Sequence, residues 1–95
     1  MKGRIAILGA GESGVGAALL AQQQGYEVFV SDSGKINDRY KSELEENQLE
    51  FEEGRHSLEQ IFNAELLVKS PGIPDQISII QEVKSRSIPV ISEIE

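Results

Sequence analysis

The chain has 95 residues, with sixteen Asp and Glu against nine Lys and Arg, and a net charge of −7. That length suits one domain, and the negative balance argues against a nucleic-acid-binding protein, which needs a basic face. The absence of cysteine excludes disulfides, thiolate metal sites and a cysteine nucleophile, and no apolar stretch reaches the roughly 20 residues that span a bilayer. Because the N-terminus has no signal-peptide pattern, we expect a cytoplasmic protein with no membrane partner.

The first part of the chain alternates between strand and helix patterns. Residues 4–8 (RIAIL) form a short apolar run typical of a strand that is buried on both faces. A glycine-rich turn covers residues 9–16, and residues 15–24 are predicted to form a helix with Gly25 just past its C-terminus. Residues 27–31 (EVFVS) are the second predicted strand.

The middle of the chain has two helix starts on either side of an acidic segment. Asn37 can cap a helix over residues 38–47, and the alternation in residues 49–53 (LEFEE) predicts a half-buried edge strand. Ser57 and Gln60 have the spacing of a capping box that opens a short helix. Six Glu and no Lys or Arg lie between positions 43 and 53, and we interpret this segment as a solvated face.

The last part of the chain contains two further strands and a helix. Residues 66–68 (LLV) form the core of a strand that Pro71 ends, Asp75 can cap the helix that follows, and residues 88–91 are the fifth predicted strand. Residues 92–95 (SEIE) again have the form of a capping box. Because a helix start is an unusual place for a natural chain to end, we expect one domain excised from a longer protein.

Five strands that alternate with four helices predict an α/β fold. We expect a Rossmann-like, doubly wound, five-stranded parallel sheet with helices on both faces and the strand order 3-2-1-4-5. In such a sheet, ligands bind beyond the carboxyl ends of the strands, where the strand order reverses. The loops that follow the first, second and fourth strands are therefore the candidate site.

The most informative motif is the G-x-G-x-x-G over positions 9–14, directly between the first strand and the first helix. Gly9 permits the tight turn, Gly11 lets a phosphate approach the backbone, and Gly14 lets the helix pack close to the strand. The helix N-terminus then offers N–H groups and partial positive charge to an anion. The motif predicts a site for an anionic nucleotide, with a purely structural turn as the alternative.

Two further loops are expected at the same edge of the sheet. Asp32 ends the second strand and could bind the ribose of a dinucleotide, or the base or sugar of another nucleotide. Its alternative role is to bond the backbone of the turn at Ser33 and Gly34. The loop over residues 70–74 (SPGIP) should face the glycine loop, where Gly72 permits close backbone approach; the alternative is a stiff loop that only ends a strand.

Patterns for catalysis and metal binding are missing from the sequence. His56 is the only histidine and has no obvious carboxylate partner at ligand spacing, so we expect it to help begin the helix at Ser57. There is no P-loop for ATP, no nucleophile elbow and no evident acid–base pair. We therefore expect a binding domain with no catalytic residue, no metal site and no cofactor of its own.

Four segments together resemble a known family: ILGAGESG at 7–14, SD at 31–32, KSPGI at 69–73 and ISEIE at 91–95. They are similar to the N-terminal domain of the Mur ligase family of bacterial peptidoglycan synthesis. The resemblance covers the whole chain but only the first of three domains. Within the family it is greatest to the ligase that adds D-glutamate to UDP-N-acetylmuramoyl-L-alanine, and smaller to the related ligase that adds L-alanine.

The resemblance implies that this domain holds the UDP part of UDP-N-acetylmuramoyl-L-alanine. The loop backbone and the Ser13 hydroxyl would cradle the diphosphate, while Asp32 and Ser33 contact the uracil and Gly72 approaches it from the opposite side. The implied UDP-binding residues are Gly11, Glu12, Ser13, Gly14, Asp32, Ser33, Ser70 and Gly72. The chemistry would belong to the remaining domains of the same polypeptide, which bind ATP and Mg²⁺, phosphorylate the substrate carboxylate and bring in the D-glutamate.

Two positions depart from the family pattern. Glu12 stands where relatives often have an apolar residue, and its carboxylate would weaken diphosphate binding unless it points to solvent. Gly34 lacks a side chain that some relatives place near the base. Two other functions stay open: an NAD(P)-binding Rossmann domain of a dehydrogenase or regulatory protein, for which the glycine loop and Asp32 alone would suffice, and a structural fragment without a ligand.

Overall fold

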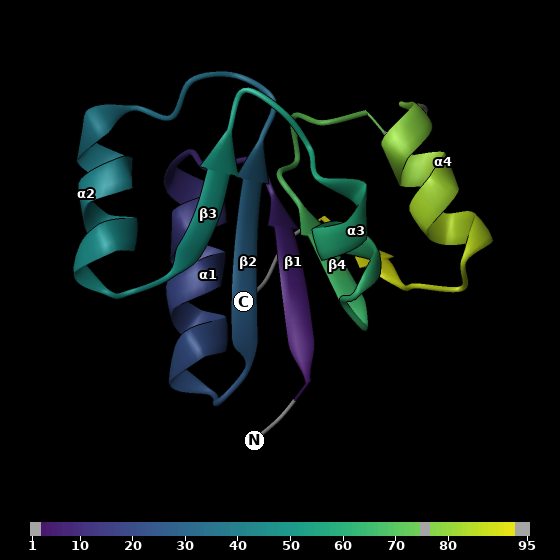
Figure 1. Cartoon of the computed structure of the whole chain (residues 1–95), viewed down its shortest axis with the longest axis horizontal. Coiled ribbons are helices and arrows are strands. Elements are labelled where there is room, and N and C mark those ends of the chain that lie inside the picture. Colours follow the sequence, from purple (N-terminus) through teal and green to yellow (C-terminus); the bar gives the residue numbers. More distant parts are fainter. Residues whose placement is uncertain (1–2, 75–76, 93–95) are drawn as a thin grey trace.

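The computed structural model describes residues 3–74 and 77–92, which fold into a parallel sheet between two layers of helices (Figure 1). The strands are β1 (Arg4–Leu8), β2 (Glu27–Asp32), β3 (Glu50–Glu53), β4 (Leu66–Lys69) and β5 (Val90–Ile91). The helices are α1 (Glu12–Gln23), α2 (Asp38–Glu46), α3 (Leu58–Phe62) and α4 (Ser78–Ser85). All strand pairs are parallel and the order is β3-β2-β1-β4-β5, which confirms the predicted fold class and topology.

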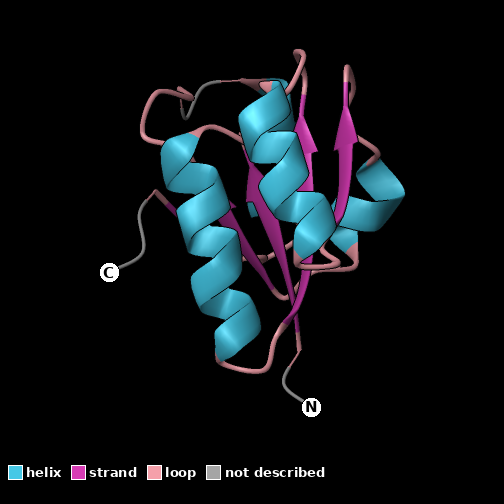
Figure 2. Cartoon of the chain, turned by 90° about the vertical axis from the view of Figure 1, so that its left-hand side faces the viewer, coloured by secondary structure: helices cyan, strands magenta, loops and turns pink. Residues whose placement is uncertain are grey.

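The two faces of the sheet are covered by different helices. Figure 2 shows α1 and α2 side by side on one face, and α3 and α4 cover the other (Figure 1). The central strand β1 contributes to both cores: Ile5 and Ile7 pack in the cluster that includes α1, whereas Ala6 and Leu8 pack in the cluster that includes α3 and α4. A strand buried on both faces has to be continuously apolar, which is the pattern of residues 5–8.

The ends of the first two helices follow the sequence signals closely. Gly25 follows α1 with φ of +95°, and the Asn37 side chain accepts the Arg39 N–H at 2.9 Å to cap α2. Helix α1 begins at Glu12, three residues earlier than Val15, where the sequence analysis began the helix. The reason is that the last residues of the glycine motif form the first helical turn, with Gly11 as the N-cap.

Two sequence interpretations around α3 are wrong. Ser57 does precede α3, but its hydroxyl donates to Glu52 Oε1 at 2.6 Å instead of capping the helix, and Gln60 accepts from Arg4 at 2.7 Å. The acidic segment is not uniformly solvated, because the Glu52 side chain is only 10% exposed and Glu53 accepts the Ile36 N–H at 2.9 Å. A buried carboxylate needs hydrogen-bond donors, and the neighbouring strand and loops supply them here.

The C-terminal elements, α4 and β5, agree in outline with the sequence prediction. Strand β5 is shorter than expected because it begins at Val90, after Pro89, and it lies at the sheet edge, where proline is tolerated. Asp75 and the capping box that involves residues 93–95 lie outside the described residues. In the described part of the chain, no helix has the length and apolar character to cross a membrane.

Candidate functional site

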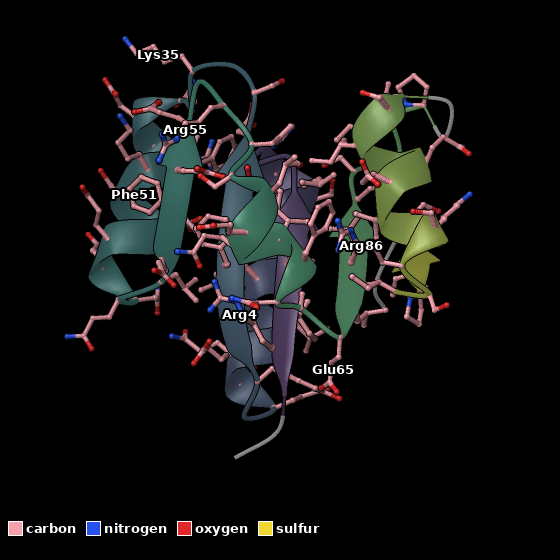
Figure 3. All side chains as sticks on the ribbon, turned by 45° about the vertical axis from the view of Figure 1, so that its right-hand side comes forward. Arg4, Lys35, Phe51, Arg55, Glu65 and Arg86 are labelled. Atoms are coloured by element: carbon pink, nitrogen blue, oxygen red, sulfur yellow. The ribbon has the colours of Figure 1, made fainter. Side chains whose placement is uncertain are left out.

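The carboxyl ends of β1, β2 and β4 meet at one edge of the sheet, beside a small cavity of ≈ 240 Å³. In Figure 3, Lys35 and Arg55 lie toward this edge, whereas Arg4 lies toward the opposite one. The cavity is lined by Gly9, Ala10, Gly11, Asp32, Ser33, His56, Ser70 and Ile73. Segments far apart in the sequence thus converge where the strand order reverses, as expected for a doubly wound fold.

A second cavity of ≈ 320 Å³ lies on the α1 side of the same loops. Its lining includes Ser13 and Gly14 from the start of α1, and Lys69 and Pro71 from the end of β4. Ser70 lines both cavities. The predicted site residues are therefore divided: Gly11, Asp32 and Ser33 line the smaller cavity, Ser13 and Gly14 line the larger one, and Glu12 and Gly72 are exposed residues that line neither.

The glycine loop agrees with the role expected for each glycine. Gly9 has φ of +98°, and a Cβ placed on Gly14 would lie 1.8 Å from the Gly9 carbonyl oxygen, so both positions require glycine. A Cβ placed on Gly11 would meet no atom within 4 Å. Gly9 and Gly14 therefore serve the turn and the close helix packing, while Gly11 leaves open space at the cavity wall.

The N-terminus of α1 presents backbone N–H groups to this edge. Gly11 has extended backbone and caps the helix without a side-chain hydrogen bond, and the first helical bond runs from the Val15 N–H to the Gly11 carbonyl at 2.9 Å. The N–H groups of residues 12–14 precede that bond and receive no capping side chain from the described residues. Such a helix end attracts anions because its partial charge is positive.

Asp32 joins two loops at the cavity. Its Oδ2 accepts the Ala10 N–H at 2.8 Å, and its Oδ1 accepts the Gly34 N–H at 2.8 Å. The structural alternative considered for Asp32 is therefore present, and it extends to the glycine loop as well. Each carboxylate oxygen has a second lone pair, so a contact between Asp32 and a nucleotide stays a prediction.

The loop after β4 is held by a buried lysine that the sequence analysis did not single out. Lys69 is 7% exposed, and its ammonium donates to the Ile73 carbonyl at 2.8 Å. The Ile73 N–H donates to the Ser70 carbonyl at 3.0 Å, which closes the turn around Gly72. The available signal was a lysine at the end of the apolar run LLVK.

His56 is the other residue of the site that sequence reasoning missed. It does not assist the start of α3: its Nδ1 lies 2.6 Å from the buried Ser31 hydroxyl, which also lies 2.8 Å from Glu52 Oε2. Burial lowers the pKa of His56 below its ordinary value, although the nearby carboxylates of Glu52 and Asp32 act in the opposite direction. Only the pairing of β2 with β3 brings these groups together, so no local signal could have revealed them.

The Glu52 carboxylate remains ionised in this environment. Burial raises its pKa, but hydrogen bonds from the Ser57 backbone and hydroxyl, from Ser31 and from Arg55 outweigh burial and leave the pKa below its ordinary value. Within the described ranges, no group of three or more His, Asp and Glu side chains is placed to hold a metal ion.

Comparisons with known proteins show the family of this chain. Residues 4–79 match the family model described as the MurD N-terminal domain. A UDP-N-acetylmuramoylalanine–D-glutamate ligase of Christiangramia forsetii is 50% identical over 97% of this chain and 21% of the relative. A ligase of the same name from Porphyromonas gingivalis is 54% identical over 100% of this chain and 21% of the relative.

Solved structures show the same fold at low sequence identity. The UDP-N-acetylmuramate–alanine ligase of Thermotoga maritima superposes with a TM-score of 0.77 at 20% identity, covering 95% of this chain and 20% of that one. A UDP-N-acetylmuramate:L-alanyl-γ-D-glutamyl-meso-diaminopimelate ligase of Neisseria meningitides gives 0.76 at 24% identity, covering 94% of this chain and 28% of that one. The chain spans about a fifth of the length of the curated relatives that it matches. It belongs to the family of MurD N-terminal domains.

Proposed function

We propose that this chain is the UDP-binding N-terminal domain of a bacterial, cytoplasmic, ATP-dependent ligase that joins D-glutamate to UDP-N-acetylmuramoyl-L-alanine. The observation that carries the proposal is the meeting of the glycine loop, the end of β2 and the loop after β4 around one cavity, beside the uncapped end of α1. The two relatives reported above are 50% and 54% identical to this chain and are named as UDP-N-acetylmuramoylalanine–D-glutamate ligases. Their names support a UDP-linked substrate over other nucleotides.

In this proposal the diphosphate lies at the N-terminus of α1. The N–H groups of residues 12–14 and the Ser13 hydroxyl donate to its oxygens, and Gly11 leaves room for their approach. Glu12 is exposed, so its carboxylate can remain in solvent away from the phosphates. The uracil lies toward Asp32 and Ser33, with Ser70 and Gly72 on the opposite side.

The reaction itself would take place outside this chain. A ligase of this type transfers a phosphoryl group from ATP to the substrate carboxylate, and the amine of D-glutamate then attacks the acyl phosphate and releases phosphate. The sequence contains no P-loop, so ATP and Mg²⁺ would bind to the other domains of the full-length enzyme. This chain contributes binding and orientation of the UDP end, which places the reacting carboxylate.

Ligand preference tests the proposal directly. UDP, ADP, CDP and NAD at equal concentration should be compared by NMR titration of the chain. We expect UDP to bind best, with the largest shifts at residues 11–14, 32–33 and 70–72. Tighter binding of NAD would instead favour the dinucleotide-binding alternative, which the glycine loop and Asp32 also fit.

Activity provides a second test. With ATP, UDP-N-acetylmuramoyl-L-alanine and D-glutamate, we expect this chain alone to release no phosphate above a control without protein. Release above that control would contradict the assignment of the chemistry to other domains.

A further inference from the structure

A series of three hydrogen-bonded side chains runs from β3 across β2 to the smaller of the two cavities, which has a volume of ≈ 240 Å³. Glu52 on β3 lies 2.8 Å from the hydroxyl of Ser31 on β2, and that hydroxyl lies 2.6 Å from Nδ1 of His56 in the loop before α3. Ser31 is fully buried, and His56 is part of the cavity wall. One end of this series is thus the ionised Glu52 carboxylate, and the other end, His56, reaches the proposed ligand site.

Hydrogen-bond counting favours one position of the imidazole proton. The Ser31 hydroxyl has one hydrogen, and two acceptors compete for it: the Glu52 carboxylate at 2.8 Å and the Arg55 carbonyl at 3.1 Å. Neither acceptor can donate a hydrogen to Ser31 in return, because a backbone carbonyl carries none and the Glu52 carboxylate is ionised. When Ser31 donates its hydrogen to Glu52, it has none for His56, and the 2.6 Å contact is then a hydrogen bond from His56 Nδ1–H to the Ser31 oxygen.

This tautomer leaves Nε2 of the neutral ring as a hydrogen-bond acceptor. Nε2 has no partner among the residues that the structure describes, and the ring lines the same cavity as Asp32. Both oxygens of Asp32 already accept backbone N–H groups, from Ala10 and Gly34. His56 therefore lines this cavity as an acceptor whose outer nitrogen bonds to none of the described residues.

We propose that His56 is a specificity-determining residue that accepts a hydrogen bond at Nε2 from a donor group of the uridine, with Ser31 and Glu52 as positioning residues. The inference rests on the proposed function, since it concerns the same nucleotide site. Two donors of a uridine nucleotide fit this chemistry: the imide N–H of the base and a hydroxyl of the ribose.

The ionisable groups around the ring favour the neutral form. Glu52 on β3 and Asp32 on β2 favour the cation, but burial outweighs them and lowers the pKa of His56. Arg55, in the same loop, is paired with Glu52 at 3.2 Å. The glycine loop and the loop after β4 contribute no ionisable group to the cavity lining.

Two substitutions test the two ring nitrogens of His56, Nδ1 and Nε2, one at a time. His56→Asn places an amide N–H where Nδ1–H meets Ser31 and removes the acceptor at Nε2, whereas His56→Gln places an amide near Nε2 and gives up the bond to Ser31. We expect His56→Asn to weaken binding of UDP-glucose by roughly 3- to 10-fold at pH 8, the value of one neutral hydrogen bond, and His56→Gln to retain more affinity. Glu59→Gln, an exposed change nearby on α3, is the matched control and should bind like the parent. Equal affinity of His56→Asn and the parent would overturn the proposal.

A change of pH distinguishes a neutral His56 that accepts a hydrogen bond from a protonated His56 that contacts the diphosphate. The diphosphate of UDP-glucose is a diester with no group that titrates between pH 5 and 8, so a change in binding over this range reports on the protein. We expect parent binding to weaken as the pH falls and His56→Asn to lose that dependence. Binding that strengthens on acidification through His56 would show a phosphate contact and overturn the acceptor role.

Analogues identify the donor. If the imide N–H bonds to His56, then 3-methyluridine diphosphate should bind parent and His56→Asn alike, whereas the 2′-deoxy and 3′-deoxy analogues of uridine diphosphate should keep the difference between them. If a ribose hydroxyl is the donor, the deoxy analogue that lacks this hydroxyl should bind both proteins alike, and 3-methyluridine diphosphate should keep the difference. If all three analogues keep the full difference, no uridine donor reaches His56 and the proposal is overturned.

The positioning role has its own readout. His56 is the only histidine, so its ring nitrogens give the only imidazole signals in a ¹⁵N spectrum. We expect the Nδ1–H form in the parent and a mixture of tautomers in Ser31→Ala, with weaker binding of UDP-glucose. An Nε2–H ring in the parent would overturn the inference.

If the unmutated chain binds no UDP-glucose at all, the proposed function fails and this inference fails with it. Binding that is insensitive to His56 overturns only the inference.

Discussion

The backbone N–H of Ala10 donates to Asp32 Oδ2 at 2.8 Å, and this bond joins the glycine loop to the end of β2. Two segments on neighbouring parallel strands are thereby held in one geometry at the cavity. The residue that the sequence marks as a nucleotide contact is also the residue that shapes the loop next to it.

Replacement of Asp32 should therefore affect both stability and binding. Asp32→Ala leaves the N–H groups of Ala10 and Gly34 without their acceptor, so we expect the free energy of unfolding to fall by about 1–3 kcal/mol in urea titration. We expect UDP binding to weaken by about 10- to 100-fold, since a hydrogen bond to a charged acceptor contributes roughly 1.5–3 kcal/mol. Asp32→Asn keeps one carbonyl acceptor and should lose less stability. If folded Asp32→Ala is less stable but binds UDP as tightly as the parent, then Asp32 has a structural role only.

Gly11 and Gly14 form a matched pair with opposite expected effects. Gly11→Val adds its side chain in open space where the diphosphate would lie, so the fold should be kept and UDP binding lost. Gly14→Ala brings a Cβ to within 1.8 Å of the Gly9 carbonyl oxygen and should destabilise the fold by several kcal/mol. Thermal unfolding and NMR titration measure the two effects. Wild-type UDP affinity in Gly11→Val would place the anion elsewhere.

Glu52 should be the most sensitive carboxylate of the acidic segment. Its oxygens accept from the Ser57 N–H and hydroxyl, from Ser31 and from Arg55, so Glu52→Gln turns an acceptor into a donor that faces other donors. We expect a loss of about 1–3 kcal/mol in the free energy of unfolding. Glu46→Gln, an exposed change in the same segment, should stay within about 0.5 kcal/mol of the parent. Equal effects of the two changes would contradict the assigned role.

The lowered pKa of His56 predicts a pH dependence of stability in the absence of ligand. Above the unfolded-state value of 6.5, the ring is neutral in both states and contributes no difference. As the pH falls below 6.5, the unfolded chain takes up a proton first, so the folded state loses stability until the pH passes the folded pKa. Urea unfolding at pH 8, 7, 6 and 5.5 measures this loss, and the difference between the parent and His56→Asn isolates it. A stability that rises on acidification through His56 would show that the pKa is raised instead.

Much of the fold followed from local patterns. The apolar run at residues 4–8, the glycine motif after it and the caps at Asn37 and Gly25 predict elements that the structure contains. The parallel order of the strands follows because right-handed crossovers leave few alternatives for a chain of alternating strands and helices. Element ends were less predictable: α1 begins within the glycine motif itself, because glycine can serve both as turn residue and as N-cap.

The candidate site was only partly accessible from sequence. Gly11, Asp32, Ser33 and Ser70 were predicted and line one cavity, because each follows a strand whose carboxyl end reaches the same edge. His56 and Lys69 were not recognised as part of the site, although they hold the walls of its two cavities through Ser31 and Ile73. Their partners are distant in sequence or lie across a turn, and a single polar residue in a pattern carries no information about its partner.

The sequence by itself determined the fold class, the strand order and the family, because hydrophobic periodicity, glycine positions and short motifs are local properties of the chain. Only the tertiary structure decided which carboxylates are solvated and which are enclosed, and which groups surround the ring of His56. Those properties depend on the register of β2 against β3, which brings Ser31 opposite Glu52 and within reach of His56. Burial and hydrogen bonding between distant segments set the charge state of a side chain, and they exist only after the sheet has formed.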